Sequence, residues 1–177
     1  ERKACGGAGV SMGGHQSAAM LKDEWLTPPE IIQALGQFDL DPCAPADGRR
    51  PWDMAARHYS VESNGLAMPW KGRVWCNPPY GLEAARWLER LADHGDGVAL
   101  IFARTETAMF FEQVWDKAHA VLFLRGRLHF HHVDGRRAAA NAGAPSVLVA
   151  YGANNVRALE NSGIQGRLVP LREVENG

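Results

Sequence analysis

Stretches of consecutive apolar residues predict the strands of a buried sheet. A strand that is covered on both faces carries apolar side chains on both sides, so it is continuously hydrophobic. Such stretches span residues 98–103, 120–124 and 146–151, with a shorter one at residues 74–76, and short strands of mixed polarity are expected over residues 38–41 and 58–61. Residues 125–132 alternate polar and apolar side chains, which predicts a half-exposed strand.

Apolar residues also recur at helical spacing between these strands. The first predicted helix has Thr27 as N-cap, proline in its first turn and Glu30 as the reciprocal cap, and it ends at Gly36. Further helices are predicted over residues 82–93, around residues 110–118, and over residues 154–162 at the surface. The buried stripes of the first three helices consist of Ile31, Ile32 and Leu35; of Trp87, Leu88, Leu91 and Ala92; and of Phe110, Phe111, Val114, Trp115 and Ala118.

Alternating strands and helices indicate an α/β fold. We expect a Rossmann-like sheet that is mostly parallel and carries an antiparallel edge strand. Residues 42–73 leave room for about one crossover unit, so the sheet is expected to be trimmed there. Residues 1–22 are rich in Gly, Ser and Ala without periodicity and predict a flexible arm, whereas residues 23–177 predict a single domain.

Residues 74–81, which read VWCNPPYG, are the strongest candidate for a site. The chain must leave the sheet at Asn77, because Pro78 and Pro79 lack the N–H donors that a central strand needs. Ligands of open α/β sheets bind just beyond the carboxyl ends of the strands. The Asn77 amide oxygen and the Pro78 carbonyl can accept both hydrogens of a planar amino group, and Tyr80 can stack on its ring. The alternative is an ordinary proline-rich turn.

The four residues Asn77, Pro78, Pro79 and Tyr80 resemble the amino-group-binding motif of S-adenosylmethionine-dependent amino-methyltransferases. Further stretches, in order over residues 23–151, are similar to the phage-type DNA N-6-adenine methyltransferase (Dam) family. They read DEWLTPP at 23–29, FDLDPCA at 38–44, GL at 65–66 with Trp70, and GRLHF at 126–130. The resemblance implies a methyltransferase sheet, S-adenosylmethionine as cofactor, double-stranded DNA as partner, and methylation of a flipped-out adenine by these four catalytic residues.

The resemblance also implies a set of cofactor-binding residues. They are Trp25, Thr27, Pro28, Asp41, Pro42, Cys43, Ala44, Asn64 and Leu66. The acid at Asp41 suits the cationic ammonium or sulfonium of the cofactor, although a strand-end Asp is often only a turn former. One feature departs from the wider methyltransferase pattern and one from the family pattern. No Gly-x-Gly follows Ala44, and Asn64 stands where an acid is common, so it can hydrogen-bond only as an uncharged group.

Charge limits the ways in which the chain can contact DNA. The formal net charge is −1, so attraction to a polyanion must come from a local basic patch. Four arginines within thirteen residues, against the single acid Asp134, form the one such cluster. With Arg104, at the end of a predicted strand, the candidate DNA-binding residues are Arg125, Arg127, Arg136 and Arg137. An ordinary solvated face is the alternative.

Cysteines, histidines and hydropathy argue against several other classes. The three cysteines are an odd number without metal-ligand spacing, which favours a reducing cytoplasm over a disulfide scaffold. His129, His131 and His132 would point to different faces of one strand without a carboxylate pair, so no metal site is expected. No apolar run approaches the roughly 18 residues of a membrane helix, and no leader pattern is present at the N-terminus. The pattern predicts no oligomeric state.

Two alternatives to a DNA methyltransferase stay open. The motif at residues 77–80 also suits an amino-methyltransferase of RNA bases or of protein glutamine. The missing Gly-x-Gly and Asn64 leave room for a non-catalytic nucleic-acid or protein binder on the same frame. Binding of S-adenosylmethionine discriminates against the second alternative.

Overall fold

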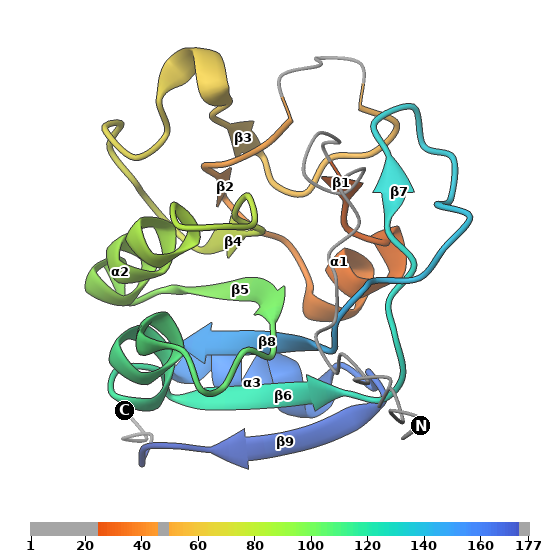
Figure 1. Cartoon of the computed structure of the whole chain (residues 1–177). Coiled ribbons are helices and arrows are strands. Elements are labelled where there is room, and N and C mark those ends of the chain that lie inside the picture. The colour runs from red at the N-terminus through yellow and green to blue at the C-terminus, as the bar shows by residue number, and fades with distance from the viewer. Residues whose placement is uncertain (1–24, 46–49, 174–177) are drawn as a thin grey trace, which may run out of the picture.

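The computed structural model describes residues 25–45 and 50–173 of the 177-residue chain. The predicted flexible arm, residues 1–22, lies outside the described residues. Within them the chain forms an α/β fold with one mixed seven-stranded sheet in the order β3-β2-β4-β5-β8-β6-β9 (Figure 1). A separate pair, β1 and β7, forms a two-stranded sheet.

The strands and helices are short at the start of the domain and longer toward its end. The strands are β1 Trp25–Leu26, β2 Leu40–Asp41, β3 Arg57–His58, β4 Val74–Cys76, β5 Gly97–Phe102, β6 Ala120–Leu124, β7 His131–His132, β8 Ser146–Tyr151 and β9 Gly166–Pro170. The helices are α1 Pro29–Leu35, α2 Ala84–His94 and α3 Ala153–Asn161, with the 3-10 turn η2 Val61–Ser63 and the π-helix η3 Phe110–Trp115.

Half of the sheet is parallel and half is antiparallel. β3, β2, β4 and β5 pair in parallel, as the sequence predicts for the strands before Ala103. The prediction of a mostly parallel sheet with an antiparallel edge is therefore only partly right, because the antiparallel edge strand is β9, which pairs with β6 and was not predicted. A second antiparallel strand, β8, lies inside the sheet between β5 and β6. The chain reaches β8 from β6 through the excursion of residues 125–145 without a crossover helix, and this return produces antiparallel pairing.

Both faces of the sheet are covered, which explains the continuously apolar strands. Trp75, Val98 and Leu100 pack with the buried residues of α1 and α3 on one face, and α3 lies behind β8 and β6 in Figure 1. Cys76 and Ala99 pack with α2 and η3 on the other face. The period-two alternation of strand side chains therefore divides one sheet between two apolar clusters.

A partly buried polar network fixes the end of the sheet at which β4 and β5 begin. The Arg73 guanidinium donates from Nε to Asn155 Oδ1 at 2.7 Å and lies over the Phe38 ring at 4.1 Å. Asn155 is fully buried, and its Nδ2 donates to Asp96 Oδ1 at 2.8 Å. These bonds join residues next to β2, β4, β5 and α3, so this end serves stability and leaves the opposite end for a site.

The capping box predicted for the first helix is wrong. The N-cap of α1 is Pro28, and no side chain accepts a hydrogen bond from the helix N-terminus. Thr27 is instead 1% exposed, and its carbonyl accepts a hydrogen bond from Trp52 Nε1 at 3.2 Å. A Thr before two prolines fits the capping pattern whether its side chain caps the helix or is buried in the core. Thr27 is buried beside β1, so it does not cap the helix.

The third predicted helix differs in type from the expectation. Its residues form a π-helix, in which hydrogen bonds join residues five apart, as between Asp116 N–H and the Phe111 carbonyl at 3.0 Å. Phe110, Val114 and Ala118 are fully buried as predicted. Phe111 is 54% exposed, so its predicted place in the core is wrong. The wider turn changes which side chains share a face.

The remaining differences concern pairing that local sequence does not encode. Residues 125–130 form no strand, and β7 pairs with β1 instead of the main sheet, with Trp25 opposite His132. β9 follows the strand that was expected to be last. No helix of the described residues is long and apolar enough to span a bilayer.

Candidate functional site

A cavity of about 450 Å³ lies at the carboxyl edge of the parallel half of the sheet. Its walls come from the residues that directly follow β2, β3 and β4, from β1, and from the start of α2. This is the edge at which parallel strands present ligands. The cavity joins most of the predicted site residues, which are far apart in the sequence. Those lining it are Trp25, Thr27, Asp41, Pro42, Cys43, Ala44, Asn64, Leu66, Asn77, Pro78, Pro79 and Tyr80.

Asn77 directly follows β4, and its side-chain oxygen is a hydrogen-bond acceptor that no donor among the described residues contacts. Its Nδ2 donates to Thr27 Oγ1 at 3.5 Å, whereas its Oδ1 is buried and has no hydrogen-bond partner. A buried acceptor left unpaired costs about 1–3 kcal/mol, so native structures contain few of them. An N–H group of a ligand would complete this site.

Tyr80 forms the aromatic wall near Asn77. Its ring stacks on Phe102, at the end of β5, with the centroids 4.1 Å apart and the planes 6° from parallel. Burial raises the pKa of the Tyr80 hydroxyl, so the phenol is neutral at physiological pH. Since Phe102 covers one face of the ring, a planar ligand can stack only on the other face.

Asp41 places a carboxyl at the end of β2. The side chain is 4% exposed, and burial raises its pKa to about 7, although the Cys43 N–H bond and the charge of Arg50 lower it in part. Cys43 N–H donates to Asp41 Oδ1 at 3.1 Å. The Arg50 guanidinium donates to the Pro45 carbonyl at 3.2 Å. A buried carboxyl with this pKa is about half protonated near pH 7. A cationic ligand bound beside it would stabilise the ionised carboxylate.

Gly65 closes the cavity by close backbone contact. A Cβ at this position would lie 1.9 Å from the Pro42 carbonyl oxygen, so only glycine fits. Trp70 Nε1 holds the segment by donating to the Gly65 carbonyl at 2.8 Å. Asn64 precedes it with φ 50° in the left-handed region. The chain lacks Gly-x-Gly after Ala44, but a glycine from another segment supplies a close approach to the loop after β2.

Two free thiols lie behind this loop. The Sγ atoms of Cys43 and Cys76 are 3.8 Å apart. The hydrogen bond with Cys76 and burial raise the pKa of Cys43 well above its ordinary value. The Cys43 thiol therefore stays protonated and is a poor nucleophile. Among residues 25–45 and 50–173, no three side chains of His, Cys, Asp or Glu gather as metal ligands.

Pro28 is the predicted cofactor residue that does not line the cavity. It caps α1, and its carbonyl accepts a hydrogen bond from Ile31 N–H at 3.0 Å. Sequence reasoning missed other lining residues, namely Leu26, Pro45, Met54, Ser60, Gly65, Trp75, Glu83 and Trp87. Ser60 follows β3 closely, so the strand-end rule could have found it. Met54 carries no such signal, and Trp87 has the pattern of an ordinary core position.

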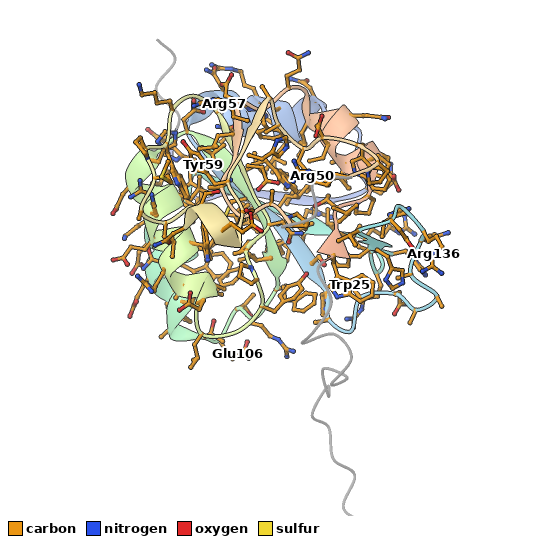
Figure 2. The ribbon with its side chains drawn as sticks, turned by 90° about the horizontal axis from the view of Figure 1, so that it is seen from above. Trp25, Arg50, Arg57, Tyr59, Glu106 and Arg136 are labelled. Atoms are coloured by element: carbon orange, nitrogen blue, oxygen red, sulfur yellow. The ribbon has the colours of Figure 1, made fainter. Side chains whose placement is uncertain are left out.

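The candidate DNA-binding arginines lie outside the cavity. Figure 2 shows Arg136 beside Trp25 at one margin of the molecule, because β7 pairs with the strand β1 that lines the cavity. Arg136 Nε donates to Asp134 Oδ2 at 2.7 Å, and its side chain is 78% exposed. Arg125, Arg127 and Arg137 are also exposed, and Arg104 is half-buried. The two histidines of β7 pack against tryptophans, with His132 4.7 Å from Trp25 between ring centroids.

Comparison with models of protein families gives a match over most of the chain. Residues 14–160 match the family model described as DNA N-6-adenine-methyltransferase (Dam). Neither the comparison with curated proteins nor the comparison with solved structures found a match. The matched range includes every residue described above that lines the cavity.

Proposed function

The chain belongs to the DNA N-6-adenine-methyltransferase (Dam) family, and from this premise we propose that it methylates the N6 amino group of adenine in double-stranded DNA. The proposed methyl donor is S-adenosylmethionine. The observation that carries the proposal is one cavity that combines the unpaired acceptor of Asn77 with the buried carboxyl of Asp41. The first suits an amino group, and the second suits a cation.

The residues around Asp41 suit the cofactor. When bound, S-adenosylmethionine supplies an electrophilic methyl group on a positively charged sulfur. The Asp41 carboxylate would attract the positively charged end of that molecule. Ser60 and Asn64, which flank η2 after β3, offer a hydroxyl and an amide to its polar groups. Gly65 leaves room for their loop to approach Pro42.

The residues after β4 suit the adenine. Asn77 Oδ1 and the Pro78 carbonyl would accept the two N6 hydrogens, and the Tyr80 face not covered by Phe102 would stack on the base. An adenine paired in a duplex cannot reach a cavity of this kind, so the base must be flipped out. Catalysis would then consist mainly of holding the nitrogen in line with the methyl carbon and sulfur.

Methyl transfer from labelled cofactor tests the proposal against its alternatives. Unmethylated double-stranded DNA, RNA and protein are offered in parallel, and the products are digested to nucleosides and amino acids. The expected product is N6-methyladenine from DNA. Label in RNA or glutamine instead would assign the enzyme to another amino-methyltransferase class. Calorimetric binding of S-adenosylmethionine without transfer to any of the three would indicate a binding protein.

A further inference from the structure

Leu82 is a fully exposed apolar side chain that lies in sequence between two residues of the cavity wall. In the described part of the chain, Leu82 and Phe111 are the exposed large hydrophobic residues, at 99% and 54%. One exposed leucine is common on a protein surface. Leu82, however, lies between Tyr80 and Glu83, which both line the cavity, whereas Phe111 lies on η3 and does not line it.

The backbone holds Leu82 outward in a defined place. Pro78 and Pro79 restrict the chain before it. Gly81 has φ 118°, a conformation that favours glycine, and its carbonyl accepts a hydrogen bond from Ala84 N–H at 3.2 Å, where α2 starts. Leu82 is therefore fixed in a turn between the end of β4 and the start of α2. A side chain presented in this way loses little backbone freedom on binding.

The reaction itself creates an apolar partner for this side chain. Extruding a base breaks its stacking and leaves a gap between the neighbouring base pairs. Proteins that distort DNA insert Leu, Phe, Ile or Met side chains between base steps, and the contact offsets the lost stacking. We propose that Leu82 is a stacking wedge that enters the duplex beside the target adenine and holds the gap open while the base lies in the cavity. This positioning role rests on the proposed function.

The substrate's base pairing distinguishes a wedge from a general structural role. Methyl transfer is measured for the wild type, Leu82→Ala, Leu82→Phe and Phe111→Ala on duplex DNA. The same variants are assayed on the denatured single strands and on duplexes with an abasic site opposite the target adenine, placed once wild-type methylation has revealed the target. Leu82→Ala is expected to lose roughly tenfold or more in kcat/KM on the intact duplex, by analogy with the free energy of burying one leucine.

The other substrates and variants provide the controls. Leu82→Ala should act like the wild type on whichever unpaired substrates the wild type methylates, because the base there needs no wedge. Leu82→Phe should retain duplex activity, and Phe111→Ala should match the wild type throughout. Equal loss on paired and unpaired targets, or no loss on the duplex, would overturn the wedge while leaving the methyltransferase proposal intact. A wild type that methylates no DNA would overturn both.

Discussion

Asp41 shows how one side chain can link function to stability. Its pKa in the folded protein, about 7, lies above the ordinary value of 3.8 because the carboxyl is buried. Folding therefore opposes its ionisation. The contribution of Asp41 to the free energy of unfolding is therefore fully present below about pH 4, and it is lost as the pH rises through about 7.

We predict that Asp41→Asn stabilises the ligand-free protein at pH 8 by roughly 1 kcal/mol or more and changes its stability little at pH 4. The amide can still accept the Cys43 N–H bond but carries no charge to desolvate. Chemical denaturation at both pH values measures the effect. Calorimetry should show weaker binding of S-adenosylmethionine by the same variant. Parallel pH profiles for the two proteins would show that Asp41 does not ionise in the fold as described.

Tyr80 permits a second prediction at this scale. Tyr80→Phe keeps the ring that stacks on Phe102 and should retain much of the methyl transfer. Tyr80→Ala removes the platform for the base and should cost roughly 1–3 kcal/mol of transition-state stabilisation. Unfolding curves provide the control, because the alanine variant also uncovers Phe102. Equal impairment of the two variants would assign the role to the hydroxyl instead of the ring.

At the scale of elements, the contact between two loops shapes the cavity. Gly65 belongs to the loop after β3 and η2, and Pro42 to the loop after β2. Trp70, in the same loop as Gly65, donates from Nε1 to the Gly65 carbonyl and so holds that loop. A substitution here acts on the arrangement of the loops and not on a chemical group.

Gly65→Ala is predicted to weaken cofactor binding and to destabilise the protein, because its Cβ would overlap the Pro42 carbonyl oxygen. A loss of about 2 kcal/mol or more is expected for displaced backbone. Gly126→Ala is a suitable comparison. It imposes left-handed strain at φ 80° with no atom within 4 Å of the new Cβ, so it should cost about 1 kcal/mol and leave cofactor affinity unchanged. Unaltered cofactor affinity in Gly65→Ala would separate this contact from the site.

The charge of the whole molecule sets the terms for DNA binding. With a net charge of −1, the protein lacks a general attraction for phosphate, so contacts must be local. The excursion that carries β7 brings the exposed side chain of Arg136 to the side of the cavity formed by β1. Arg136 thus lies on the side of the molecule where β1 lines the cavity.

We predict that each Arg→Ala change at Arg125, Arg127, Arg136 and Arg137 lowers the slope of log affinity against log salt by about one unit. Fluorescence anisotropy with labelled duplex at several salt concentrations measures the slope, and cofactor affinity should be unchanged. A quadruple variant with the slope of the parent would return the cluster to an ordinary solvated surface.

The sequence predicted those parts of the molecule that local patterns encode. Buried strands are continuously apolar, so β4, β5, β6 and β8 were found close to their true bounds, and the strand-end rule placed Asp41 and Asn77 at one edge. Pairing between distant segments has no local signal. Neither the β1–β7 pair nor the interior position of β8 could be read from residues 125–151. Thr27 misled because its capping pattern is compatible with burial beside Asn77.

The proposed function depends most on Asn77, which would accept a hydrogen bond from the amino group that receives the methyl. The most direct measurement compares the wild type with Asn77→Ala in cofactor binding and in formation of N6-methyladenine. For Asn77→Ala we expect cofactor affinity within a few fold of the wild type and a loss of roughly a hundredfold or more in methyl transfer, because the acceptor acts chiefly in the transition state. Near-wild-type turnover by Asn77→Ala would contradict it.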